Sequence, residues 1–294
     1  ALPPPLTLPV YCTSLRQRMA PKQGYEAMLE GSLAKIRAPW GVQALQGLMG
    51  GAYVALGGLF ANLMAAGFSG STQPALPDLV AGAVFPVGLI AIFLTGANLS
   101  TGNYMYVVSP VLSGAVSPFR AAAFLALSFV TNFCGAVSVV VVIAYLGEWT
   151  HDGPVHGYIL RKAEHKCRLG WGVALLRGVG ANWLVCLGMW QAWCCTDTLS
   201  KIVSIWWPVF AFVAIGFEHS VANMYYVDMG LVEGAEVNFD QFVLRNLIPV
   251  TLGNMVGGGV LIGLVQWLTY GEACDSEEGK PSPRDDAVSG AEAG

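Results

Sequence analysis

The sequence predicts an all-α integral membrane protein with six transmembrane helices. Hydrophobic residues make up 54 % of the 294 residues and charged residues only 12 %, whereas soluble domains carry roughly 25 % charged residues. Six stretches approach or exceed the roughly 20 apolar residues that a membrane-spanning helix needs. The second and the fifth are interrupted by polar, glycine-containing segments. Matched interruptions of this kind predict an inverted 3+3 repeat with broken second and fifth helices.

The domain boundaries follow from these stretches. We expect an N-terminal tail with an interfacial amphipathic helix over residues 1–38, a six-helix transmembrane domain over 39–270, and a disordered acidic tail over 271–294. An even number of spans places both ends of the domain on one side of the membrane. The predicted spans cover residues 40–68, 79–111, 119–146, 171–195, 202–229 and 242–270.

The segment before the first span alternates apolar and basic residues from residue 15 to residue 37, which predicts a helix lying on the membrane. A plain basic anchor on the lipid surface is the alternative. No apolar core of a secretory signal precedes Trp40, and the first acidic residue is Glu26. An acid-free opening with Arg and Ser leaves open an organelle-targeting segment.

The two interruptions are the candidate site. In the second span the interruption contains Thr95, Gly96 and Asn98, and in the fifth it runs from Gly216 through Glu218 to Asn223. Irregular backbone and ionisable groups at membrane depth are tolerated where they line a cavity or are buried in protein. Half-helix N-termini at such breaks favour anions. We therefore expect a transport path between the breaks, with Glu218 accepting hydrogen bonds from backbone or helix-end donors.

His219 is the polar centre of this path. Phe212 lies two helical turns before it, and Phe85 and Leu89 share a helix face in the other half. Apolar rings around one histidine predict a constriction that passes a neutral molecule far more easily than an ion. A weak-acid anion should therefore gain a proton before it crosses, and a desolvated histidine should be neutral and donate a hydrogen bond. A histidine satisfied within the core is the structural alternative.

Buried asparagines also need partners. Asn182 lies in an apolar run, where it either contacts substrate or bridges helices, and we favour the pore. Asn246 and Asn254 in the sixth span are expected to form interhelical hydrogen bonds.

Basic residues gather between the third and fourth spans, on the side opposite the chain ends. Positive charge on that side predicts an electrostatic funnel for anions, with a solvated loop face as the alternative. The residues are Arg161, Lys162, Lys166, Arg168 and Arg177.

Enzyme and metal chemistry are not indicated. The seven cysteines have no zinc-type spacing, and only one of the four histidines lies in a span. We expect no cofactor, no metal, no nucleic-acid partner and no intramembrane enzyme. A water or glycerol pore is disfavoured because paired Asn-Pro-Ala breaks are absent.

Residues 216–224 and 246–254, together with Thr95-Gly96 and residues 101–103, resemble the formate/nitrite transporter family. The resemblance extends over about residues 15–270. It implies an aquaporin-like six-helix protomer in a homopentamer, in which each protomer has its own pore. Members of the family move formate, nitrite, lactate or hydrosulfide and, in plastid relatives, bicarbonate.

The resemblance also implies roles for individual residues. His219 corresponds to the central histidine and Thr101 to the threonine that bonds with it, while Asn182 corresponds to the pore asparagine. The constriction residues would be Phe85, Leu89 and Phe212, and the vestibule lysines that attract the anion would be Lys35 and Lys166. One departure concerns the second-span break, where Asn98 and Ser100 replace an acidic residue and a phenylalanine; this break should be less acidic and less obstructed.

Taken together, these features predict a channel or transporter for small monovalent anions of weak acids or for their neutral acids, coupled to protons near His219. A bicarbonate/nitrite channel of an organelle envelope is the alternative. The plasma membrane is the favoured location, with the chloroplast envelope as the alternative.

Overall fold

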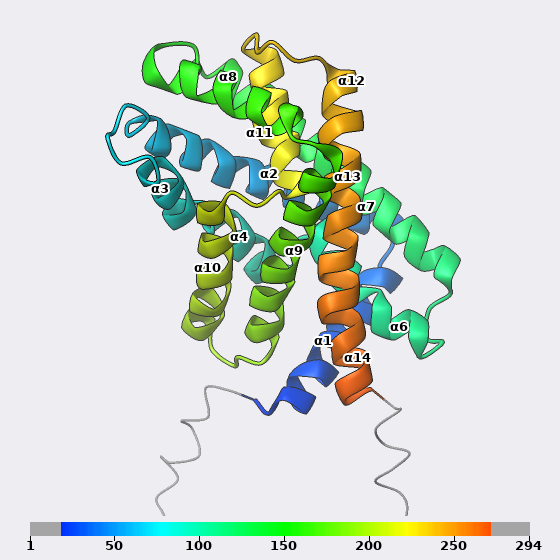
Figure 1. Ribbon diagram of the computed structural model, residues 1–294. Helices are drawn as coiled ribbons and strands as arrows, with labels where there is room; N and C mark the ends of the chain where they lie inside the picture. Colours follow the sequence, from blue (N-terminus) through cyan, green and yellow to red (C-terminus); the bar gives the residue numbers. More distant parts are fainter. Residues whose placement is uncertain (1–18, 272–294) are drawn as a thin grey trace, which may run out of the picture.

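The computed structural model describes residues 19–271, which contain helices and no strands (Figure 1). Six helical stretches are long and apolar enough to cross a membrane. They cover Trp40–Ala66, Leu76–Thr95, Pro118–Tyr145, Trp171–Trp193, Thr198–Ile215 and Phe239–Tyr270. The predicted all-α membrane fold is confirmed. The first 18 residues of the predicted N-terminal tail and residues 272–294 of the predicted acidic tail lie outside the described residues.

The first half of the chain begins with α1 (Pro21–Arg37) and the first span, α2 (Trp40–Ala66). The second span consists of α3 (Leu76–Val84) and α4 (Val87–Thr95), and after a break the chain continues as α5 (Ser100–Tyr106) and α6 (Val108–Leu112). The third span joins α7 (Pro118–Ser138) to the π-helical turn η2 (Val139–Tyr145).

The second half repeats this order. α8 (Gly153–Arg168) precedes the fourth span, α9 (Trp171–Trp193), and the broken fifth span consists of α10 (Thr198–Ile215) and α11 (Ser220–Val232). The sixth span runs without interruption through α12 (Phe239–Gln241), η3 (Phe242–Leu247), α13 (Ile248–Met255), η4 (Val256–Leu264) and α14 (Val265–Tyr270).

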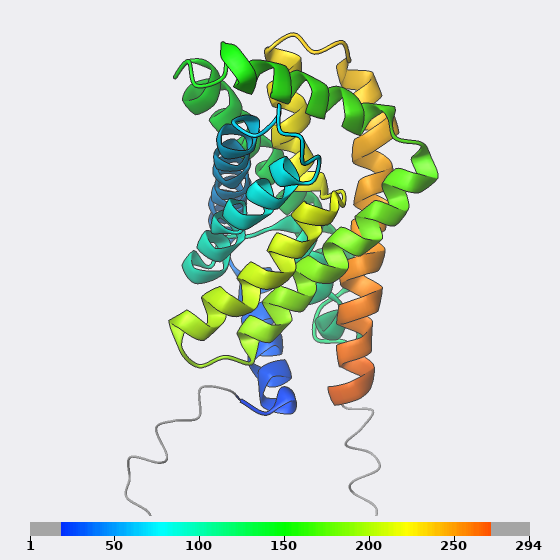
Figure 2. The ribbon, with the colours of Figure 1, turned by 60° about the vertical axis from the view of Figure 1, so that its left-hand side comes forward.

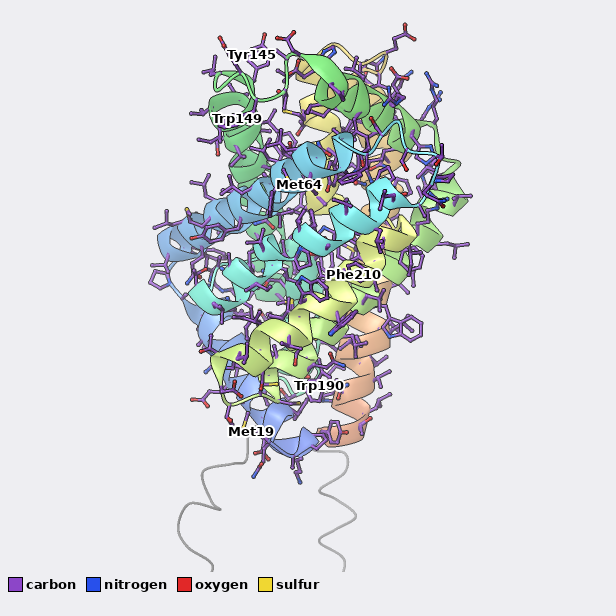
Figure 3. All side chains as sticks on the ribbon, turned by 90° about the vertical axis from the view of Figure 1, so that its left-hand side faces the viewer. Met19, Met64, Tyr145, Trp149, Trp190 and Phe210 are labelled. Atoms are coloured by element: carbon purple, nitrogen blue, oxygen red, sulfur yellow. The ribbon has the colours of Figure 1, made fainter. Side chains whose placement is uncertain are left out.

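The two halves have opposite orientations. α1 lies at one end of the helix bundle and α8 at the other, and the two broken spans meet between them (Figures 1 and 2). Met19 and Trp190 mark the α1 end, whereas Tyr145 and Trp149 mark the α8 end (Figure 3). α14 ends beside α1, so the first and last described helices lie on one side, as an even number of spans requires.

The helix α8 was not predicted, because the sequence between the third and fourth spans was interpreted as a loop. It begins with proline in its first turn and ends with basic residues in its last turn, which are ordinary helix start and stop signals. Its buried positions Ile159, Ala163, Lys166 and Cys167 form one helical face. One of those four residues is charged, so a search for apolar periodicity finds only a weak signal.

Glycine allows the central helices to approach closely in both halves. A Cβ on Gly51 in α2 would collide with the backbone of Asn132 in α7, and a Cβ on Gly253 in α13 would collide with the Leu175 carbonyl of α9. These contacts hold α2 against α7 and α9 against α13. Small residues are the usual means of close helix packing in membranes.

The described part of the predicted amphipathic segment forms α1 from Pro21 to Arg37, and residues 15–18 of the prediction lie outside the described residues. The helix buries Tyr25, Met28 and Ile36 against the bundle. Its Lys35 reaches the break after α4, where the Nζ atom donates a hydrogen bond to the Gly96 carbonyl at 2.6 Å. The helix therefore contributes to the interior of the protein, and a role as a lipid anchor alone does not describe it.

Candidate functional site

Both interrupted spans break at a left-handed glycine. Gly96 follows α4 with φ 76°, and Gly216 follows α10 with φ 78°. Three residues later the chain is extended, at Leu99 with φ −110° and at His219 with φ −120°, and a second helix begins at the next serine. Left-handed backbone is costly for residues with a Cβ. The matched glycines therefore position Leu99 and His219 as equivalent residues at the two half-helix N-termini.

One asparagine holds each break in the same way. The Asn132 Oδ1 atom accepts a hydrogen bond from the Ser100 amide at 2.8 Å, while its Nδ2 atom donates to the Asn98 and Gly47 carbonyls. In the other half, Asn254 Oδ1 accepts from the Ser220 amide at 2.9 Å, and its Nδ2 donates to the Glu218 and Gly178 carbonyls. Backbone groups freed by the breaks are thus satisfied inside the protein. Asn254 makes the interhelical bond expected of it.

A lysine also lies at each break. Lys35 Nζ donates to the Gly96 and Ala97 carbonyls and, at 3.2 Å, to Asn98 Oδ1. Lys166 Nζ instead pairs with the Glu218 carboxylate at 3.0 and 3.1 Å. Burial lowers the pKa of Lys35 to about 8. The Lys166 charge is offset by a carboxylate, whereas Lys35 contacts only neutral groups at its break.

Glu218 lies at the centre of a side-chain network. Besides Lys166, its Oε2 atom accepts hydrogen bonds from Asn223 Nδ2 at 2.7 Å and Asn246 Nδ2 at 3.2 Å. Asn246 also donates to the Lys166 carbonyl. The expectation that backbone or helix-end donors satisfy this carboxylate was wrong, because all the donors to its oxygens are side chains. Glu218 lies two residues after Gly216, and the equivalent residue in the first half, two residues after Gly96, is Asn98.

His219 links the two halves. Its Nδ1 atom accepts from the Ala222 amide at 3.1 Å, which caps α11, and its Nε2 atom lies 2.8 Å from Thr101 Oγ1 in α5. Because Nδ1 accepts a hydrogen bond, we assign the proton of the neutral ring to Nε2, which donates it to the threonine oxygen. A second proton on Nδ1 would point at the Ala222 N–H and remove the cap. The geometry therefore favours the neutral ring.

Three cavities follow one another past this histidine. The α8-side cavity has a volume of about 440 Å³ and is lined by Lys162, Lys166, Arg177 and Glu218, among others. The central cavity has a volume of only about 10 Å³, and the α1-side cavity, with Lys35 and Lys201 in its lining, has about 180 Å³. His219 belongs to the first two cavities and Leu99 to the last two. The protein thus contains two vestibules with lysines in their linings, joined by a narrow apolar centre.

The central cavity brings together the predicted constriction residues. Phe85, Leu89 and Phe212 are each less than 5 % exposed. The Phe85 and Phe212 rings pack edge to face with centroids 5.9 Å apart, and Phe212 lies 5.8 Å from the His219 ring. Phe212 and His219 do not share one helix, as the spacing suggested, because the chain breaks at Gly216 between them. The break itself brings them together.

Sequence reasoning missed four residues of the central lining. An apolar side chain among many others gives no signal by itself. Leu99, however, aligns with His219 when the two breaks are superposed on their glycines, and this comparison would have found it. The four residues are Val54, Leu99, Val185 and Val209.

Asn182 bridges helices through its amide nitrogen, while its Oδ1 atom has no hydrogen-bond partner among the described residues. Its Nδ2 atom donates to the Thr101 carbonyl at 2.9 Å and to the Asn254 carbonyl at 2.7 Å. Neither Asn182 nor Thr101 is in the lining of the three cavities. Asn182 reaches His219 only through Thr101. Thr95 ends α4 and donates to the Ala91 carbonyl of its own helix.

Comparison with known proteins agrees with this architecture. The family model described as Formate/nitrite transporter matches residues 22–268. A probable formate transporter of Methanothermobacter thermautotrophicus is 40 % identical over 251 residues, covering 80 % of this chain and 91 % of the relative. The formate channel FocA of Escherichia coli K12 is 34 % identical over 221 residues, covering 69 % and 77 %.

Solved structures are similar as well. A structure titled FNT family ion channel has a TM-score of 0.74 at 28 % identity, with 85 % of this chain and 98 % of that chain covered. A pentameric formate channel with formate bound has a TM-score of 0.67 at 27 % identity, with 85 % and 99 % covered. The matched glycine breaks, the buried histidine and these similarities agree, and the chain belongs to the formate/nitrite transporter family.

Proposed function

We propose that this protein conducts small monovalent weak acids of the formate, nitrite and lactate class across a membrane, with protons, through the three cavities. One observation carries the proposal: His219 is the one polar side chain in the described lining of the central cavity. The relatives named as formate transporters and channels support the substrate class.

The path would discriminate against bare ions. Phe85, Leu89 and Phe212 offer no groups that could replace the hydration shell of an anion, so a charged solute would lose most of its solvation there. A weak acid that gains a proton crosses as a neutral molecule. Lys35 at one entrance, and the basic residues that surround the Lys166–Glu218 pair at the other, would raise the local concentration of the anion.

His219 would act as a neutral polar group whose two ring nitrogens are already hydrogen-bonded within the protein. Its Nε2–H is directed at Thr101 and its Nδ1 is held by the Ala222 amide. A ring held in this way contacts the passing acid without itself carrying a charge. The proton that neutralises the anion would then come from water in the vestibule, and the apolar centre would favour the neutral acid once it forms.

We further propose a homopentamer in which each protomer has its own path. The similarity to a pentameric formate channel supports this assembly. The three cavities follow one another within a single chain, which supports one path for each protomer. Large apolar side chains such as Leu176, Trp207 and Leu244 are exposed on the single chain and are available for lipid or for neighbouring protomers.

Uptake into proteoliposomes tests the proposal. Labelled formate, nitrite, lactate and bicarbonate would be supplied at pH 5.5 and 7.5, with empty liposomes as the control. We expect uptake of at least one of the first three solutes to be faster at pH 5.5. Uptake of bicarbonate alone, or uptake independent of pH, would contradict proton coupling and favour a plain anion channel.

A further inference from the structure

The α8-side cavity contains a second lysine whose surroundings differ from those of Lys166. Lys162 lies one helical turn earlier on α8 and lines the same cavity. Its Nζ atom lies 4.0 Å from the centre of the Tyr226 ring and 5.2 Å from that of Tyr158, with the Tyr158 hydroxyl at 3.5 Å. Within residues 19–271 it has no salt bridge, whereas Lys166 is paired with Glu218. Lys162 is therefore the ammonium that can still accept an anionic partner.

Tyr226 supplies a second donor at this position. The residue is 5 % exposed and lines the cavity, yet its hydroxyl has no hydrogen-bond partner among the described residues. Buried hydroxyl groups are normally hydrogen-bonded, so an unpartnered one beside a cavity indicates a place for a ligand. A lysine over the ring and a hydroxyl at its edge form a pair of donors suited to a small oxyanion.

This pair lies at the start of an aromatic route to the constriction. The Tyr226 ring stacks on Phe85 with centroids 6.2 Å apart. Phe85 packs against Phe212, which in turn lies beside His219. A solute bound at Lys162 would therefore be positioned directly before the apolar centre.

We propose that Lys162 Nζ and the Tyr226 hydroxyl form an entrance binding site for a small monovalent oxyanion, a carboxylate or nitrite, in the α8-side cavity. The site rests on the proposed transport function and assigns anion contact to Lys162 rather than to Lys166. Lys166 then serves to hold Glu218 and the Gly216 break. The anion would bind here in its charged form and leave toward Phe85 as the neutral acid.

The charge of Lys162 is sensitive to its surroundings. Burial and the neighbouring Lys166 charge lower the pKa of Lys162 to about 7, while Asp78 of α3 and Glu218 oppose that shift. The other ionisable groups in the cavity lining are Tyr158, Arg161 and His165 of α8, Arg177 of α9, Tyr226 of α11, and His219 at the N-cap of α11. Because a bound anion favours the ammonium, binding should weaken as the pH rises through 7.

The test compares two single charge removals on α8. Initial uptake of labelled formate is measured with Lys162→Gln and Arg161→Gln in proteoliposomes, in low and in high potassium gluconate. Arg161 is an exposed neighbour lining the same cavity, so its substitution removes the same formal charge. We expect Lys162→Gln to raise the apparent KM about tenfold at both salt concentrations. A tenfold change corresponds to the loss of one charge-assisted hydrogen bond. The effect of Arg161→Gln should largely vanish in high salt, where long-range fields are screened.

Two conservative variants keep the test decisive if Lys162→Gln does not assemble. Tyr226→Phe removes only the hydroxyl and should raise KM several-fold. Lys162→Arg keeps the charge at all pH values. For the wild type, the loss of ammonium between pH 6 and pH 8 should raise KM by up to about tenfold, and Lys162→Arg should reduce that rise.

The outcomes separate the two proposals. A wild type that moves none of the labelled anions would contradict the transport function. A wild type that moves formate, with Lys162→Gln and Tyr226→Phe both retaining its KM in high salt, would overturn the entrance site alone. If the effect of Lys162→Gln disappears in high salt together with that of Arg161→Gln, the entrance site is also overturned. Lys162 would then act through long-range electrostatic attraction and not through direct contact with the anion.

Discussion

The Nε2 atom of His219 lies 2.8 Å from Thr101 Oγ1, and this contact joins the two halves of the inverted repeat. Thr101 belongs to the half-helix that follows the first break, and His219 caps the half-helix that follows the second. The repeat places leucine at the position equivalent to His219. A nearly symmetric scaffold thus carries one asymmetric polar group at its centre.

Substitution of His219 should separate its two tasks. His219→Phe removes both the N-cap and the polar contact, and we expect altered formate uptake with a weaker dependence on pH. Loss of the cap should cost about 1 kcal/mol of stability. His219→Asn is the matched control, because asparagine is a good N-cap but does not reproduce the imidazole contact. Uptake kinetics and size-exclusion profiles of both variants distinguish the tasks.

If His219→Phe fails to assemble and His219→Asn transports with the pH dependence of the wild type, the histidine is structural. The same uptake assay and elution profile decide this.

The asparagines of the two breaks should be required for stability. Asn132→Leu and Asn254→Leu each leave a buried serine amide and two carbonyls without their side-chain partner. Each buried unsatisfied group costs about 1–3 kcal/mol. We expect a large fall in the thermal unfolding midpoint in detergent for both variants and a similar fall for each. An unchanged midpoint for either variant would show that its break is held by other contacts.

The buried pair of Lys166 and Glu218 should behave non-additively. Glu218→Gln leaves the Lys166 ammonium, on a side chain that is 9 % exposed, without its carboxylate, and breaking a buried pair in this way costs roughly 3–5 kcal/mol. Lys166→Met in the same chain removes the unpaired charge and should recover part of the loss. Thermal unfolding of the wild type, both single variants and the double variant measures the coupling. Additive losses would contradict a direct ion pair within the network.

The loop before α8 should respond to pH through His151. Its ring nitrogens face the Glu233 carboxylate, at 3.3 Å, and the Tyr145 carbonyl, at 2.8 Å, so the doubly protonated ring satisfies both. Desolvation lowers the pKa of His151, but the hydrogen bond and charge of Glu233 outweigh it, and the pKa is raised above 6.5. The protonated ring therefore stabilises the fold. This stabilisation is complete at pH values below the pKa of His151 in the unfolded state, and it is lost as the pH rises through the pKa in the folded state.

His151→Gln should therefore lower the unfolding midpoint more at pH 5.5 than at pH 8.5. Glu233→Gln should abolish this difference between the two pH values. An equal effect of His151→Gln at both pH values would rule out the contact as a source of pH dependence.

Much of the fold follows from the sequence because the membrane imposes simple requirements. Six apolar stretches and two glycine-containing interruptions predict the spans and the breaks, and Gly96 and Gly216 lie at those breaks with the left-handed geometry that only glycine adopts easily. The helix α8 escaped detection because one of its four buried positions is Lys166. A charged residue buried by a partner distant in the sequence does not look apolar in any local window.

The site is predicted less completely than the fold. His219 gave a signal because an ionisable residue in an apolar span is unusual. Leu99 is a common membrane residue whose position becomes informative only when the two halves are superposed. Tyr226 is recognised only from its place in the cavity lining and its unpartnered buried hydroxyl. We expected Asn182 to line the pore. In the structure its amide nitrogen bridges α5 and α13. Which buried polar group faces the path depends on helix rotation, which local sequence does not determine.

The most direct test of proton-coupled passage measures how initial formate uptake depends on the membrane potential. Proteoliposomes loaded with potassium, with valinomycin added, would be held at defined potassium diffusion potentials with equal pH on both sides. If the acid crosses the His219 constriction in neutral form, initial formate uptake should be the same at an inside-negative and an inside-positive potential. Uptake that slows at an inside-negative potential and speeds up at an inside-positive one would show that the bare anion crosses, and would contradict the mechanism.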